Sequence, residues 1–145
     1  MIRVRFIAAA LMVVALLAAT GCASDSPTFV DAGARYTQQD VAAVLDEVDA
    51  GSVMGEPTSQ AADLRSSALG ALRGQGEAAA GAADLITRTF TKSTPGVPVY
   101  VERATFNDKP ALVIVEAIGP PGGKLGDLRI WAIDETGQVL YSGTR

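Results

Sequence analysis

The chain has 145 residues, one cysteine, no histidine and a formal net charge of -4. This length is typical of a single domain. The absence of histidine excludes an imidazole base and a histidine metal ligand, and one cysteine cannot form a disulfide within the chain. The acidic balance argues against binding nucleic acid through a basic surface. We therefore expect no nucleic-acid partner and no metal or other cofactor.

The amino-terminal 22 residues carry the clearest signal in the sequence. Arg3 and Arg5 give a positively charged start, and Phe6–Ala19 is an unbroken apolar run of 14 residues followed by small residues. This order is typical of a secretory signal peptide. The run is short for a membrane-spanning helix, which needs about 17–25 residues. Uncharged residues continue to Ala23 and lengthen it to 18, so an uncleaved anchor is an alternative.

The signal ends at the only cysteine of the chain. The segment Ala19-Thr20-Gly21-Cys22 resembles the lipobox of bacterial lipoproteins. That resemblance implies that residues 1–21 are a signal peptide cut just before Cys22. It also implies a lipid on the Cys22 thiol, with a further acyl chain such as palmitate on the new amine. Two or more acyl chains anchor a protein stably, whereas one binds a membrane only marginally. The alternative is an ordinary signal peptide that leaves a secreted protein without lipid.

The chain after Cys22 has a net negative charge, and its first residues show no hydrophobic period. Removing residues 1–21 leaves 10 basic and 16 acidic residues, a net charge of -6. Charge would not draw such a chain to an anionic membrane, so the lipid on Cys22 would make the membrane contact. Residues 23–36 contain serine, aspartate, proline and glycine. We expect a lipidated tether over residues 22–36 and a single domain over residues 37–145.

Three helices are predicted at the start of this domain. The first begins at Thr37, which with Asp40 forms a variant of a capping box, and ends before Gly51. Its apolar residues recur at helical spacing: Val41, Val44, Leu45 and Val48. The second helix is predicted over residues 58–73 and the third over residues 77–90. Two glycines between them favour a break, with one kinked helix as the alternative.

The second half of the chain changes to the period of β-strands. Runs rich in β-branched and aromatic residues predict four strands, over residues 97–106, 111–117, 128–133 and 138–142. Asn107-Asp108 marks a tight turn between the first two strands. Helices followed by a run of strands favour an α+β fold. We expect two or three N-terminal helices packed on a four-stranded antiparallel β-meander.

Two strand carboxylates, Glu102 and Glu116, are the candidates for acid–base chemistry. A turn at Asn107-Asp108 places Glu102 opposite Val113 and Glu116 opposite Val99, on opposite faces of the sheet. That arrangement argues against a catalytic pair, so we do not expect an enzyme. An envelope enzyme that uses Glu102 and Glu116 is the alternative.

A second group of acidic residues lies in and just after the first predicted helix: Asp46, Glu47, Asp49 and Glu56. Calcium is the one metal that such a set suits, but the alternating spacing of a calcium loop is absent. We interpret the group as a solvated acidic helix face.

Both faces of the predicted sheet are apolar. One face would carry Val99, Val101, Leu112 and Ile114, and the other would carry Tyr100, Phe106, Val113 and Val115. Either helices cover both faces, or one face meets a partner or a second copy. The candidate contact residues are Tyr100, Lys124, Arg129 and Trp131, with Leu140 expected across from Trp131.

The sequence therefore predicts a lipid-anchored protein on the extracytoplasmic face of the cell membrane. We expect a non-catalytic module that binds a protein or another envelope component, through the sheet or through the loop Gly119–Asp127. The sequence leaves the partner and the oligomeric state open.

Overall fold

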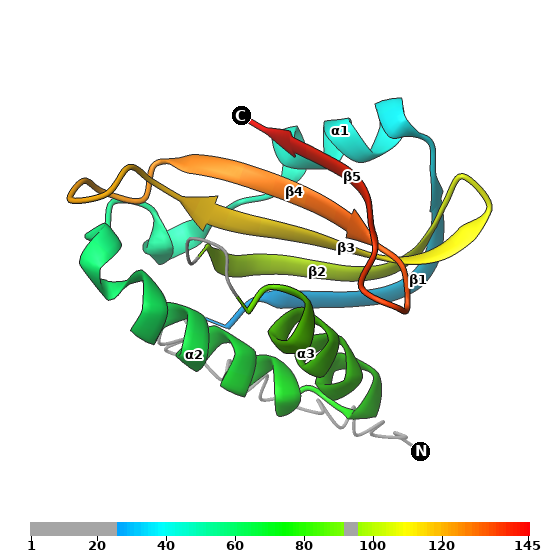
Figure 1. The fold of residues 1–145 in the computed structure, drawn as a ribbon, viewed down its shortest axis with the longest axis horizontal. Coiled ribbons are helices and arrows are strands. Elements are labelled where there is room, and N and C mark those ends of the chain that lie inside the picture. Colours follow the sequence, from blue (N-terminus) through cyan, green and yellow to red (C-terminus); the bar gives the residue numbers. More distant parts are fainter. Residues whose placement is uncertain (1–25, 92–95) are drawn as a thin grey trace, which may run out of the picture.

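A computed structural model describes residues 26–91 and 96–145 of the chain. In this part, α2 and α3 lie against one face of a five-stranded sheet and α1 lies against the other (Figure 1). The strands are β1 (Thr28–Tyr36), β2 (Val97–Phe106), β3 (Lys109–Ile118), β4 (Asp127–Ile133) and β5 (Val139–Thr144). The helices are α1 (Gln38–Glu47), α2 (Ala61–Arg73) and α3 (Glu77–Thr89), with short 3₁₀ turns at Gly51–Val53 and Thr58–Gln60.

The sheet is mixed, and this corrects the predicted fold. Its strands follow one another in chain order, β1 to β5; β1 runs parallel to β2 and the other neighbours are antiparallel. A four-stranded antiparallel meander is therefore wrong. The helices do not precede all strands but lie between β1 and β2 in the sequence. A parallel pair needs such a crossover, because two strands that run the same way cannot be joined by a tight turn.

The additional strand, β1, comes from residues that the sequence predicts as a tether. Thr28 lies opposite Tyr100 and Tyr36 lies opposite Phe106, so the tether prediction is wrong for residues 28–36. Most of this edge strand is exposed, and main-chain hydrogen bonds hold it more than buried side chains do. Main-chain pairing leaves no hydrophobic period in a sequence. The predicted signal peptide, residues 1–21, and the segment 22–25 lie outside the described residues.

The helix predictions agree well with the structure. Thr37 caps α1: its hydroxyl accepts a hydrogen bond from the Asp40 amide, and the Asp40 carboxylate accepts one from the Thr37 amide. This is the predicted capping box. The second and third helices are separate, and Gly76, which precedes α3, has a φ of 116° that favours glycine.

The β2–β3 hairpin has the predicted turn and most of the predicted register. Asn107 and Asp108 have φ values of 46° and 64°, as a two-residue hairpin turn requires. Glu102 pairs with Val113 as predicted. A bulge between Pro98 and Tyr100 then shifts the register, so Glu116 lies opposite Pro98 rather than Val99. The bulge also places Val99 on the α1 side, where the sequence did not predict it.

Apolar side chains fill both sides of the sheet. The cluster on the α1 side includes Val41, Val44, Leu45, Val113, Val115, Leu128 and Ile130. The cluster on the α2–α3 side includes Leu69, Leu72, Ile86, Val101, Leu112, Ile114 and Ile133. Helices therefore account for the two apolar faces that the sequence shows.

The pairing of β4 with β5 departs from the prediction in one place. Trp131 pairs with Ser142 rather than lying across from Leu140. The register of this pair shifts between Ala132 and Ile133, and Leu140 packs on the α1 side of the sheet. A shift of one residue moves a side chain to the other face, which explains the error.

Candidate functional site

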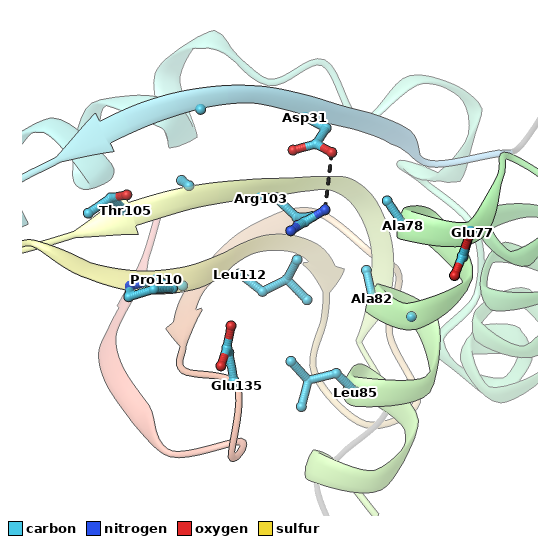
Figure 2. Close-up of a pocket in the computed structure, with 14 residues that line it drawn as sticks. Asp31, Glu77, Ala78, Ala82, Leu85, Arg103, Thr105, Pro110, Leu112 and Glu135 are labelled. Atoms are coloured by element: carbon cyan, nitrogen blue, oxygen red, sulfur yellow. Dashed lines mark hydrogen bonds and ion pairs between the residues drawn. The ribbon is translucent and has the colours of Figure 1, made fainter.

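A cavity lies between α3 and the strands β1, β2 and β3, and we call it the α3 groove (Figure 2). Its volume is about 710 Å³, within the range of small-ligand sites. The groove exists because α3 turns small residues, Ala78 and Ala82, toward the end of the β2–β3 hairpin. The lining residues with side chains longer than that of alanine are Asp31, Glu77, Leu85, Arg103, Thr105, Pro110, Leu112 and Glu135.

A local irregularity of β1 shapes one wall of the groove. Val30 pairs with Glu102 and Ala34 with Ala104, so the three residues between Val30 and Ala34 lie opposite Arg103 alone. Gly33 in this bulge has a φ of 69°, which favours glycine. The guanidinium of Arg103 donates to Asp31 Oδ2 at 3.2 Å, so both charges of the wall are paired.

The rest of the groove combines an apolar floor with an acidic rim. Leu85, Leu112 and Ala82 are buried, whereas Glu77 and Glu135 are exposed. Figure 2 shows Leu112 between the paired Arg103 and the carboxylate of Glu135 in the view drawn. Arg103 is paired with Asp31, and within the described residues Glu77 and Glu135 form no ion pair. Arg88 Nη2 donates to the carbonyl oxygen of Glu135 at 3.4 Å, so the rim has two carboxylates and one nearby guanidinium. Such a site suits a ligand with an apolar body and positive groups.

A smaller cavity of about 310 Å³ lies on the opposite side of the sheet, against α1. We call it the tyrosine pocket. Its lining residues are Thr28, Tyr36, Val44, Glu47, Val48, Asp49, Val99 and Tyr100. Residues from β1, the end of α1 and β2 meet here, so the pocket depends on the strand that the sequence did not predict.

Glu102 lies beside the tyrosine pocket and is only 2% exposed. The hydroxyl groups of Tyr36 and Tyr100 both donate to Glu102 Oε2, each at 2.8 Å. Burial, the hydrogen bond to Glu102 and the charges of Glu102 and Glu47 raise the pKa of Tyr36 to about 12. The same influences raise the pKa of Tyr100. Both phenols therefore stay protonated as hydrogen-bond donors.

Glu116 is buried on the other face, at 1% exposure, in a different environment. Its Oε1 accepts a hydrogen bond from Arg65 Nη1 at 2.6 Å. Its Oε2 accepts from Arg129 Nη2 and from the indole nitrogen of Trp131, each at 2.9 Å. The Arg129 guanidinium also lies 4.9 Å from the centre of the Trp131 ring, which packs against Phe90. Two guanidiniums thus share one carboxylate.

The structure does not bring the predicted contact residues into one surface. Tyr100 lines the tyrosine pocket, whereas Arg129 and Trp131 lie on the α2–α3 side with Glu116. Lys124 belongs to the β3–β4 loop and its backbone forms a bridge with Pro57. Glu102 and Glu116 face opposite sides of the sheet, as the sequence predicts.

Sequence reasoning missed Tyr36, because it lay in the predicted tether, and the groove carboxylates Glu77 and Glu135, because they lie on separate elements with no shared motif. The acidic segment 46–56 gives no metal centre: within residues 26–91 and 96–145, no three carboxylates or cysteines are grouped closely enough to hold an ion.

Cys22, the predicted site of lipid attachment, lies outside the described residues. Within residues 26–91 and 96–145, no helix is long and apolar enough to cross a membrane. Comparisons with protein-family models, curated proteins and solved structures find no significant match.

Proposed function

We propose that this protein is a lipid-anchored binding module of the extracytoplasmic face of the cell membrane, and that the α3 groove holds a positively charged, amphipathic peptide segment of an envelope partner. The groove carries this proposal, because it joins a buried apolar floor to a rim with two carboxylates that form no ion pair within the described residues. The apolar floor favours leucine-like side chains. The acidic rim favours lysine or arginine and disfavours anionic ligands.

The positions of the buried glutamates support binding rather than catalysis. A carboxylate pair that cleaves a bond must flank it on one substrate, with the two groups about 5–10 Å apart across it. Glu102 and Glu116 instead face opposite sides of the sheet, and each accepts several hydrogen bonds. Neither is free to meet one substrate together with the other.

The peptide proposal is tested with the full chain in non-ionic micelles and a fluorescent peptide that alternates leucine and lysine. The double variant Glu77→Gln with Glu135→Gln removes the charges of these two rim carboxylates. We expect binding to weaken about five- to tenfold, since an exposed charge pair is worth about 0.2–1 kcal/mol. A matched control, Asp63→Asn with Asp127→Asn, changes the net charge equally outside the groove and should leave binding unchanged.

Two results would overturn this assignment. One is equal binding of the analogous leucine–glutamate peptide, which would show that charge plays no part. The other is equal weakening by the control variant, which would show that only the overall charge of the protein matters. Empty micelles give the background binding of the peptide.

The anchor is tested separately by Cys22→Ser. The lipobox resemblance leads us to expect that this variant accumulates as a precursor or leaves the membrane fraction. A Cys22→Ser protein that is processed normally and stays membrane-bound would contradict lipid attachment at this residue.

A further inference from the structure

The two buried glutamates of the sheet differ in how their charge is balanced. Glu116 meets two guanidiniums, from Arg65 and Arg129. Glu102 is equally buried, yet within the described part of the chain its hydrogen bonds come from two phenols and no ion pair reaches it. Neutral donors solvate a carboxylate but do not neutralise it, and a buried charge normally has a counter-ion. The α1 side of the sheet therefore has a negative charge without a cation.

A cavity lies next to this charge. The phenols that donate to Glu102, Tyr36 and Tyr100, both line the tyrosine pocket. Glu47 and Asp49 line it as well, and no lysine or arginine is among its lining residues. The charge of Glu47 also raises the pKa of both tyrosines. The pocket is thus open space lined by two carboxylates, with the Glu102 carboxylate behind the phenols.

The remaining lining suits an alkyl chain. Val44 and Val48 come from the α1 segment and Val99 from the bulge of β2. Together with the faces of the two tyrosines, they give apolar surface beside the acidic groups. Aromatic faces also attract cations. A volume of about 310 Å³ admits a short chain but not a large ligand.

We propose that the tyrosine pocket binds a primary alkylammonium group, the chemistry of a lysine side chain or of a free alkylamine. The ammonium lies near the Glu47 and Asp49 carboxylates and balances the charge of Glu102 behind the phenols, while its alkyl chain contacts the valines. A metal ion fits less well, because no three carboxylates or cysteines within the described ranges are grouped closely enough to hold one. An ammonium carries three donors for the carboxylates, whereas a quaternary amine carries none.

This site goes beyond the proposed function. It lies across the sheet from the α3 groove and shares no lining residue with it. Failure of either proposal therefore leaves the other standing, because each is tested by its own variants.

The experiment follows the three tyrosines of the full chain, labelled with carbon-13 on their rings, during titration with butylammonium. We expect saturable shifts of the Tyr36 and Tyr100 signals, with a dissociation constant of about millimolar order or below. Tyr141 does not line the pocket and serves as the internal reference. Butanol, which is the neutral analogue, and tetramethylammonium, which lacks donors, should bind at least about tenfold more weakly.

Two variants connect the binding to the carboxylates. Glu102→Gln keeps an acceptor for both phenols but removes the charge, and it should weaken butylammonium binding about tenfold or more. Asp46→Asn removes an exposed carboxylate of α1 that does not line the pocket, and it should bind like the unaltered protein. The spectrum of Glu102→Gln without ligand shows directly whether the fold is kept. If Glu102→Gln does not fold, Glu47→Gln removes a different pocket charge at an exposed residue and tests the same point.

The source of the ammonium is resolved by a capped tripeptide with a central lysine. Equal shifts with this peptide assign the pocket to a protein side chain, and shifts with butylammonium alone assign it to a free amine. The proposal is overturned if butanol or tetramethylammonium binds as well as butylammonium. It is also overturned if no saturable shift occurs, or if folded Glu102→Gln or Glu47→Gln protein binds like the unaltered chain.

Discussion

At the scale of single residues, the molecule stabilises two buried carboxylates in different ways. Glu116 is held by charged donors, Arg65 and Arg129, together with the Trp131 indole. Glu102 is held by neutral phenols. Removing Glu116 therefore takes away the carboxylate that two guanidiniums share, whereas replacing Glu102 with glutamine breaks no ion pair in the described part of the chain. The two positions should respond differently to substitution.

The first prediction concerns Glu116. Glu116→Ala should lower the free energy of unfolding by about 3–5 kcal/mol, because it removes the buried carboxylate that Arg65 and Arg129 share. Urea denaturation measures the change. Asp31→Ala is the control: it breaks the exposed Asp31–Arg103 pair and should cost less than about 1 kcal/mol. Equal losses of unfolding free energy in the two variants would show that the buried Glu116 pairs stabilise the fold no more than the exposed Asp31–Arg103 pair does.

The second prediction concerns pH and Tyr36. Its pKa rises from the ordinary 10.0 to about 12 in the folded protein. Between these values the folded chain binds more protons than the unfolded chain. The contribution of Tyr36 to the free energy of unfolding is therefore fully present below pH 10 and is lost as the pH rises toward 12. In Tyr36→Phe this loss should be smaller, so the stability difference between the two proteins should narrow across the range. Denaturation at several alkaline pH values measures it, and a constant difference would contradict the assignment.

At the scale of elements, β1 and the bulges mark the limit of what the sequence predicts. The Thr37 cap and the Asn107-Asp108 turn are local devices, and both were predicted correctly. β1 was missed because an exposed edge strand buries too few side chains to show a period. The bulge at Pro98 was also missed, although a proline in a central strand has no amide hydrogen for the ladder and is typical of such an irregularity. The tyrosine pocket depends on both features, so it was not predicted.

The third prediction tests β1 directly. Amides of residues 28–30 and 34–36 that point toward β2 should exchange slowly with deuterium, because they pair with that strand. Residues 31–33 should exchange quickly, because three residues of the bulge lie opposite Arg103 alone. Hydrogen exchange of the full chain measures both. Uniformly fast exchange from 28 to 36 would support the tether that the sequence predicts.

At the scale of the whole molecule, β1 changes the relation of the domain to its proposed anchor. Five residues lie between Cys22 and Thr28. Even fully extended, they span only about 17–18 Å. A lipid on Cys22 would therefore hold the folded domain close to the membrane, rather than at the end of a long tether.

The fourth prediction follows from this short connection. Limited proteolysis of the membrane-bound protein should release the domain by cleavage before Thr28, if at all, and not within residues 28–36. The reason is that paired β-strands resist proteases more than unpaired chain does. Mass spectrometry of the released fragment gives the site. A fragment that begins between residues 29 and 37 would show that β1 is not part of the stable fold.

The α3 groove, whose lining comes from three strands, α3 and the β4–β5 turn, is the basis of the proposed function. The most direct test is to map the leucine–lysine peptide onto the full chain by amide chemical shifts. We predict changes that saturate together at Gly33, Gly81, Arg103 and Leu112, which line the groove, and that persist in Glu47→Gln protein, whose tyrosine pocket has lost one carboxylate. Changes confined to α1, or none at saturating peptide, would contradict the assignment of the groove as the binding site.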